Sequence, residues 1–254
     1  MLKSVVLLGL LAVVLGAAQS KNVVPLLDGR IVGGENTTIS AHPYIVSLLR
    51  SNSHTCGGAL ISTTWVLTAA HCVSPLLSYS VRVGSTYRNS GGDVIAVSRL
   101  IRHPNYSSAT IDNDIAALQL ASPTSNPDAI PISLVPEGGA PQAGLIATIS
   151  GWGALSEGGP SPTILQVVRV PVVSQSDCRA AYGQNAITDR MFCAGVLGVG
   201  GQDACQGDSG GPVVINGVLT GLVSWGNGCA RPNHPGVKTS IAPLRSWVRN
   251  NTGI

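Results

Sequence analysis

The stretch GQDACQGDSGGP, residues 201–212, sets two carboxylates and a serine among small residues. Asp203 lies six positions before Ser209, and Asp208 directly precedes it. A loop of glycines can bury little of the apolar surface whose removal from water stabilises a folded chain. We therefore expect the two acids and the hydroxyl to serve a chemical purpose, with partners elsewhere in the sequence.

The first 20 residues have the composition of a secretory signal peptide. Lys3 supplies the positive start, residues 5–14 form an apolar run, and small residues follow where a signal would be cut. A transmembrane anchor is the alternative, but this run is shorter than the ~20 residues that a spanning helix needs. We predict a signal peptide over residues 1–20 and a secreted, extracellular protein.

The chain contains six cysteines, and an oxidising extracellular compartment favours their joining into disulfides. Sequence alone leaves the pairing open. Zinc binding is the other use of several cysteines, but none of them has the short CxxC spacing typical of a zinc site. Export also agrees with three matches to the N-glycosylation pattern, at Asn36, Asn105 and Asn250.

The formal net charge is only +3, and the basic residues do not cluster. Proteins that bind nucleic acid concentrate Lys and Arg on one face, and membrane-surface helices combine such a face with an apolar one. The sequence has neither pattern, so neither nucleic acid nor a membrane is an expected partner. Lys238 is the single lysine after residue 30.

Residues 31–254 alternate short apolar stretches with Gly, Pro, Ser and Asn. This pattern predicts an all-β sandwich or barrel. Examples of these stretches are residues 44–49, 65–68 and 217–223. Only the tail is expected to be helical, because its apolar residues recur at the spacing of one helix face. These residues are Ile241, Leu244, Trp247 and Val248.

The sequence offers partners for Ser209. A reactive serine needs a general base beside it and a third group that orients the base. His71 lies in the run TAAHC next to a cysteine, and Asp112 and Asp114 stand before an apolar stretch. Taken singly, a histidine or a serine is more often structural than catalytic. Their combination with the Gly-rich loop predicts a hydrolytic site.

Several motifs occur in an order and spacing that resembles the chymotrypsin-type serine proteases. They are residues 30–34 (RIVGG), 68–72 (TAAHC), 114–116 (DIA), 151–153 (GWG), 207–212 (GDSGGP) and 224–226 (SWG). The resemblance covers residues 31–254, and the runs 191–195 and 223–229 most resemble secreted fungal trypsins. It implies two six-stranded antiparallel β-barrels with a C-terminal helix, in a monomer with the catalytic site between the barrels. Protein or peptide substrates and protein inhibitors are the partners it implies.

The resemblance assigns the catalytic roles. Ser209 matches the nucleophile, His71 the general base, and Asp114 the buried partner of His71. Asp112 is the rival for that last role, but the family's acid stands directly before Ile-Ala, as Asp114 does. The backbone N–H groups of Gly207 and Ser209 match the oxyanion hole. The pairing that the resemblance implies is Cys56 with Cys72, Cys178 with Cys193, and Cys205 with Cys229.

Asp208 matches the residue that receives a new chain end in this family. Cleavage after Arg30 would give Ile31 an ammonium group that can pair with Asp208 and order the oxyanion loop. Residues 21–30 are therefore expected to be an activation pro-segment. The alternative is that Asp208 only caps a turn. With the switch, activity should fall at high pH as the new amine loses its charge, and at low pH as His71 is protonated.

Asp203 matches the base of the primary specificity pocket of trypsins, where it would attract Arg or Lys side chains. The walls would be Ala204, Ser224, Gly226 and Gly236. Lys238 departs from the family, which usually has tyrosine there. We expect its flexible side chain to turn away, so that the preference for Arg and Lys survives. If its ammonium reached Asp203 instead, the specificity would be broader.

No cofactor or metal is expected, because Ser-His-Asp chemistry uses only protein groups and water. Residues 73–94 contain Asp93 as their single acid, and calcium requires several oxygen ligands, so we expect no structural calcium there. The second hypothesis is a catalytically silent relative that acts as a binding protein. Such relatives usually lose a triad residue or the activation junction, and this chain keeps both.

Overall fold

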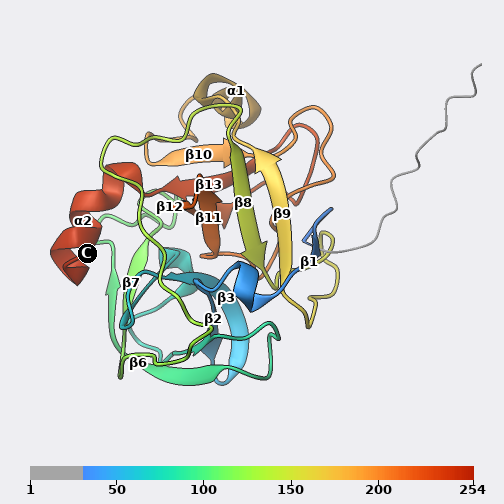
Figure 1. Ribbon diagram of the computed structural model, residues 1–254. Helices are drawn as coiled ribbons and strands as arrows, with labels where there is room; N and C mark the ends of the chain where they lie inside the picture. Colours follow the sequence, from blue (N-terminus) through green and yellow to red (C-terminus); the bar gives the residue numbers. More distant parts are fainter. Residues whose placement is uncertain (1–30) are drawn as a thin grey trace, which may run out of the picture.

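The structure, a computed structural model, describes residues 31–254, so the predicted signal peptide and pro-segment lie outside the described residues. Its strands form two antiparallel β-sheets, which Figure 1 shows one above the other. The strands are β1 (Glu35–Asn36), β2 (Ile45–Arg50), β3 (Ser53–Leu60), β4 (Trp65–Thr68), β5 (Ser80–Val83), β6 (Asp93–Arg102), β7 (Ala116–Leu120), β8 (Ile146–Gly151), β9 (Gln166–Pro171), β10 (Met191–Ala194), β11 (Pro212–Ile215), β12 (Val218–Trp225) and β13 (Gly236–Ser240).

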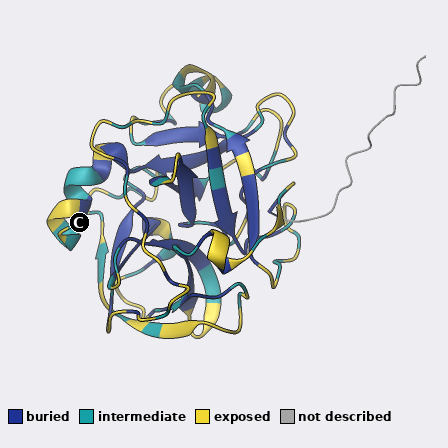
Figure 2. Ribbon diagram, viewed as in Figure 1, coloured by how far each residue is buried: buried dark blue, intermediate teal, exposed yellow. Residues whose placement is uncertain are grey.

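The first sheet is a closed six-stranded barrel in the order β2-β3-β4-β7-β6-β5. Its interior is filled by aliphatic side chains that alternate with outward-facing residues, as the two-residue period of a strand requires. Val46, Leu48, Leu60, Val66 and Leu118 are among them, and each is at most 1 % exposed. Strand β6 keeps one face in water, and Figure 2 shows exposed segments along this side of the barrel.

The second sheet has the order β1-β9-β8-β11-β12-β13-β10. The strands β9 and β10 also approach each other, because a bridge pairs Val172, just after β9, with Ala194 at the end of β10. Backbone hydrogen bonds from Val173 N–H to Cys193 O and from Gly195 N–H to Pro171 O, of 2.9 and 3.0 Å, extend this contact. The six strands from β9 to β10 thus close on themselves, and the predicted all-β fold with two barrels is confirmed.

The C-terminal helix α2 (Arg245–Thr252) is confirmed, and it follows a 3₁₀ turn at Ala242–Leu244. Its predicted apolar face packs in one cluster with β4 and β12 side chains. The expectation that only the tail is helical is wrong. Helix α1 (Gln175–Tyr182) begins at Ser174, whose Oγ accepts a hydrogen bond of 3.1 Å from Asp177 N–H. No helix within residues 31–254 is long and apolar enough to cross a membrane.

The two sheets touch along the loop that carries the GDSGGP motif. Gly57 in β3 donates its N–H to the carbonyl of Ser209 over 2.8 Å. A side chain at Gly57 would put its Cβ only 2.8 Å from Gly211 Cα, so this close approach of two backbones requires glycine. Trp152, which is 1 % exposed, also spans the boundary by donating Nε1–H to Thr86 O. The candidate site lies along this boundary.

Candidate active site

His71 and Asp114 are brought together by the pairing of two strands in the first barrel. His71 lies in the 3₁₀ turn Ala70–Cys72 after β4, and Asp114 lies just before β7. Thr68, at the end of β4, pairs with Ala116, at the start of β7, so His71 and Asp114 lie at the same end of this strand pair. His71 Nδ1 donates to Asp114 Oδ2 over 2.8 Å, and its backbone N–H donates to Oδ1 over 2.9 Å. Because Nδ1 carries the proton, Nε2 is left with the lone pair of a general base.

Asp114 is also held by the second sheet. It is only 1 % exposed, and Ser224 in β12 donates its hydroxyl to Asp114 Oδ2 over 2.6 Å. Thr239 in β13 donates its hydroxyl to the Asp114 carbonyl over 3.0 Å. These bonds satisfy a carboxylate whose burial would otherwise be unfavourable. Sequence analysis placed Ser224 only in a pocket wall, so its contact with the triad acid was missed.

The rival acid, Asp112, points to other partners. It accepts hydrogen bonds from Arg190 Nε over 2.9 Å and from Thr188 Oγ1 over 2.8 Å. Burial acts to raise the pKa of Asp112, but these hydrogen bonds outweigh it and leave the pKa below its ordinary value. Asp112 therefore ties the loop before β7 to the segment before β10 and does not contact His71.

Ser209 lies in the loop that packs on the end of β4. A Cβ added to the next residue, Gly210, would lie 2.8 Å from Ala69 N, two residues before His71. Within the described part of the chain, however, no hydrogen bond joins Ser209 to His71, and His71 Nε2 lies 3.8 Å from Cys72 Sγ. Catalytic hydrogen bonds are often long without substrate and tighten when it binds. The structure thus brings the loops of the predicted triad together without the nucleophile–base bond.

The predicted oxyanion donors are free to bind a ligand. Gly207 and Ser209 donate no backbone hydrogen bond to any described residue, and unpaired N–H groups seek a partner. Gly207 has a φ of +96°, which a residue with a side chain adopts only with strain. His54, in β3, donates from Nε2 to Gly207 O over 3.0 Å and accepts at Nδ1 from the Ser47 hydroxyl over 2.8 Å.

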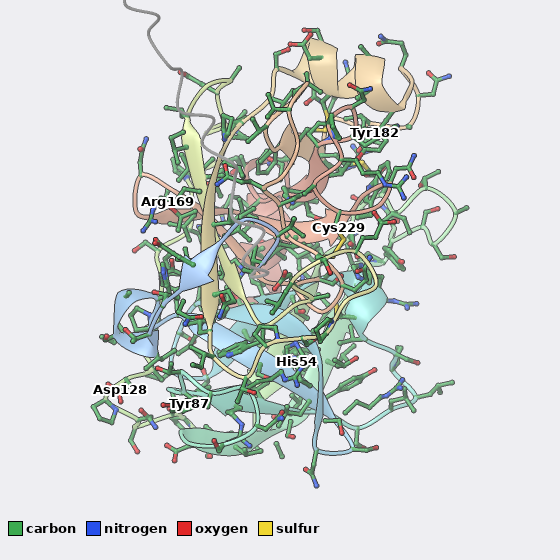
Figure 3. All side chains as sticks on the ribbon, turned by 90° about the vertical axis from the view of Figure 1, so that its right-hand side faces the viewer. His54, Tyr87, Asp128, Arg169, Tyr182 and Cys229 are labelled. Carbon is green, nitrogen blue, oxygen red and sulfur yellow. A yellow bond between two sulfur atoms is a disulfide. The ribbon has the colours of Figure 1, made fainter. Side chains whose placement is uncertain are left out.

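His54 was missed by sequence analysis, because a single histidine in a strand carries no motif. Burial lowers its pKa to about 4, so it is neutral and its tautomer follows from its two partners. Figure 3 shows His54 in the half of the molecule formed by the first barrel, with Cys229 and Tyr182 in the other half. The bond from His54 to Gly207 therefore links the first barrel to the oxyanion loop.

Three disulfides hold the segments of the site. Cys56–Cys72 joins β3 to the turn that carries His71. Cys205–Cys229 joins the nucleophile loop to the segment after β12, and Cys178–Cys193 joins α1 to β10. In residues 31–254 the one cluster with metal-ligand spacing is Cys56, His71 and Cys72. Both of its sulfurs belong to a disulfide, so they are not available as thiolate ligands.

Asp208 is completely buried. Its Oδ1 accepts from Gly153 N–H over 2.7 Å, and its Oδ2 accepts from Cys205 N–H over 2.9 Å. Burial raises the pKa of Asp208 to about 6 in spite of these bonds. Ile31 is also fully buried, in the core of the second barrel. The next residue, Val32, accepts a hydrogen bond from Asp203 N–H, so the start of the described chain lies beside the motif loop.

The predicted pocket residues line one cavity of about 220 Å³, and Ser209 lines the same cavity. These residues are Asp203, Ala204, Ser224, Gly226 and Gly236.

The expected orientation of Lys238 is wrong. Its side chain is 1 % exposed, and Nζ donates to Asp203 Oδ1 over 2.9 Å at the floor of the cavity. The strand β13 is buried on both faces, so a side chain directed inward has no path to water, and a carboxylate lies within its reach.

Comparison with known proteins agrees with this geometry. A model of the family described as Trypsin matches residues 31–248. The chain belongs to the trypsin family. It is 48% identical to trypsin delta of Drosophila erecta over 99% of this chain and all of the relative. It is 50% identical to trypsin Blo t 3 of Blomia tropicalis, over 87% of this chain and 86% of the relative.

Membership of the trypsin family makes the chain a trypsin-like serine endopeptidase, with peptide bonds of proteins as its substrates. The expected likeness to fungal trypsins in particular is not supported, because these relatives come from flies and a mite. The runs at 191–195 and 223–229 that suggested it surround disulfide cysteines and the pocket wall.

Proposed function

We propose that this member of the trypsin family is secreted, is made as an inactive precursor, and becomes active when the chain is cut after Arg30. The observation that supports catalysis is the Asp114–His71 pair, held by Ser224 from the second barrel, beside the cavity that Ser209 helps to line. Activation by cleavage is supported by the burial of both Asp208 and Ile31. Glycosylation at Asn36, Asn105 and Asn250 remains part of the proposal, and all three are exposed.

The proposed reaction follows the Ser-His-Asp scheme. Ser209 Oγ forms a bond to the substrate carbonyl carbon while its proton passes to His71 Nε2. The negative charge on the carbonyl oxygen is met by the N–H groups of Gly207 and Ser209. The C–N bond then breaks as His71 returns the proton to the leaving amine. Water attacks the acyl-enzyme by the same steps and releases the acid.

The proposed activation depends on the surroundings of Asp208. This carboxylate is fully buried and is met by two backbone N–H groups, with its pKa raised to about 6. An ammonium group on Ile31 would supply the missing charge from a residue that is itself buried beside the motif loop. The capping alternative does not account for a carboxylate that lies wholly away from water.

Two specificities are open for this enzyme. Cleavage after Arg or Lys is supported by Asp203 at the floor of the pocket and by the relatives named trypsin. The broader alternative is supported by the 2.9 Å contact between Lys238 and Asp203, which leaves no net charge there. We adopt the broader alternative, since the ammonium already stands where a basic substrate would place its own.

Labelling with a fluorophosphonate tests the proposed chemistry without assuming a specificity. Full-length protein, its R30Q variant and the S209A variant are treated with a protease that cuts after Arg, then with the probe, and the modified peptide is located by mass spectrometry. We expect rapid labelling at Ser209 only in the cleaved wild-type chain. Equal labelling of the R30Q variant would contradict the precursor, and no labelling at all would favour the non-catalytic hypothesis.

A further inference from the structure

Lys238 is a buried cation in a cavity that opens to the active site. It is the single lysine among residues 31–254, and its whole side chain is inside the protein. Asp203, its partner, has a side chain only 3 % exposed. Asp203 Oδ1 also accepts a bond of 2.7 Å from Ala204 N–H. Buried charges of this kind are stable mainly when they are paired, as these two are.

The ion pair changes which substrate side chain the cavity can stabilise. A lone buried carboxylate attracts a cation, because no other group compensates its charge. Here Lys238 already compensates it. An incoming Arg or Lys would place a second positive charge beside the ammonium, and like charges at short range in a poorly hydrated site repel strongly. An incoming Glu or Asp would in turn meet the carboxylate of Asp203.

The ion pair also occupies the floor of the cavity. A Cβ added to Gly236 would lie 2.4 Å from Lys238 Nζ and 2.5 Å from Asp203 Oδ1, so the pair fills the space under this glycine. Gly226 also lines the cavity, and a Cβ there would make a tight contact of 3.2 Å with Gly228 O, so glycine at this position keeps a side chain out of the cavity. The cavity of about 220 Å³ is also lined by Val223, Trp225 and the two cysteines of the Cys205–Cys229 disulfide, together with the polar Gln206, Ser209 and Ser224.

We propose that Lys238 makes this cavity a site for uncharged side chains, with tyrosine the preferred type. The body of the ring would pack between the walls, and the hydroxyl could donate to Asp203 Oδ2, which has no hydrogen-bond partner among the described residues. The hydroxyl oxygen could also accept from a second N–H of Lys238 Nζ. The inference rests on the proposed function, because it concerns the residue that precedes the bond cut by Ser209.

The first experiment uses the activated wild-type enzyme and matched peptide substrates that differ only in Tyr, Phe, Arg or Glu before the scissile bond. Active sites are counted by fluorophosphonate titration, which reports the proposed chemistry separately. We expect kcat/KM for Tyr to exceed that for Arg ~10-fold or more, because a substrate that leaves buried charges unsatisfied binds the transition-state site less tightly. Titratable Ser209 with Arg preferred, or Glu preferred, would overturn the inference while leaving the proposed function intact.

The second experiment replaces the cation. In K238M and K238Y the carboxylate loses its internal partner, so the Arg/Tyr ratio of kcat/KM should rise ~10²-fold in both. The matched control is R169M, which removes a cation that is 57% exposed on β9 and is not among the residues that line the cavity; its ratio should stay at the wild-type value. Unchanged ratios in both Lys238 variants would overturn the inference.

The affinity for a small cation tests the same inference without relying on catalytic turnover, which the variants could lose for other reasons. Benzamidine is a small aromatic cation whose affinity reports whether the floor of the cavity accepts positive charge. Its Kd should be high for the wild-type enzyme and should fall ~10²-fold in K238Y, because an unpaired carboxylate then receives the amidinium. Tight binding by the wild-type enzyme would contradict a neutral pocket even if K238M and K238Y failed to fold.

Discussion

Asp203 and Asp208 stand five residues apart in one loop, and the protein treats their charges in opposite ways. Asp203 has its cation within the folded chain, since Lys238 Nζ lies 2.9 Å away. Asp208 is equally buried, but its hydrogen-bond partners are two backbone N–H groups, and its pKa is raised to about 6. Asp203 already has a positively charged partner, whereas Asp208 would gain one if the chain were cleaved before Ile31.

This difference separates two roles that a buried carboxylate can have near an active site. A permanently paired acid defines the shape and polarity of a cavity, and it contributes little attraction to a further charge. A buried acid that lacks a cation is unfavourable in its ionised form, and a new positive group beside it would remove that cost. In the function proposed above, the first role concerns the substrate and the second concerns activation.

The largest expected effect comes from removing the charge of Asp208 in the activated enzyme. In D208N the ammonium of Ile31 has no partner, and the amide Nδ2 faces an N–H donor. The oxyanion loop should lose its order, and kcat should fall ~10²–10³-fold, as when an oxyanion donor is lost. The control D128N removes an exposed acid that has no ion pair in the described residues. Full activity in D208N, measured with sites counted by titration, would show that no switch operates here.

Breaking the Asp203–Lys238 pair should affect stability in a way that depends on the partner. In an S209A background that prevents self-digestion, K238M should lower the free energy of unfolding by about 3 kcal/mol, because it leaves a buried carboxylate unpaired. The double variant D203N/K238M should recover most of that loss. Urea unfolding of K238M, D203N and D203N/K238M measures the coupling free energy between Asp203 and Lys238. Strictly additive losses would mean that the ion pair contributes no coupling.

Most of the triad could be predicted, because each member lies in a short motif that the fold requires locally. His71 lies in the turn just after β4, Asp114 lies just before β7, and Ser209 lies in a glycine-rich loop. The helix α1 could also have been found, since Ser174 and Asp177 have the spacing of a cap. What the motifs did not contain was the direction of single side chains across the interface between the sheets.

Lys238 illustrates why that direction could not be predicted. A lysine has a long, flexible side chain, so its ammonium can reach either water or a buried partner, and the sequence does not indicate which. The choice depends on whether the strand β13 is buried on both faces and whether Asp203 lies within reach, 35 positions earlier. The contact of Ser224 with Asp114 is of the same kind, because these residues are 110 positions apart.

A smaller effect should appear in the pH dependence of the uncut S209A chain. The pKa of Asp208 in the folded chain, about 6, is above its ordinary value of 3.8, so the folded state binds this proton more tightly. The stabilisation is therefore complete below the ordinary pKa and is lost as pH rises through about 6. Against S209A/D208N, the loss should amount to about 2–3 kcal/mol. After cleavage the Ile31 ammonium should lower the pKa of Asp208, and the same curve should become flat; an unchanged curve would contradict the pairing.

The smallest expected effect tests His54, which supports the same loop without any charge. H54F leaves Gly207 O and the Ser47 hydroxyl without their partner, so it should lower the free energy of unfolding by about 1 kcal/mol and kcat only a few-fold. H54Q retains a donor and should lose less.

The pH dependence separates His54 from Asp208, because the shift has the opposite sign. The pKa of His54 in the folded state, about 4, is below its ordinary 6.5, so burial favours the neutral ring. The stability that depends on this neutral ring is present above pH about 6.5 and is lost as pH falls toward about 4. Urea unfolding of S209A should show this loss, and S209A/H54Q should show a smaller one, because the buried His42, whose pKa burial also lowers to about 4, is still present. An equal loss of stability at low pH in S209A/H54Q would contradict this account. The hydrogen bond from His54 to Gly207 O would then contribute no measurable free energy to the loop of residues 207–209.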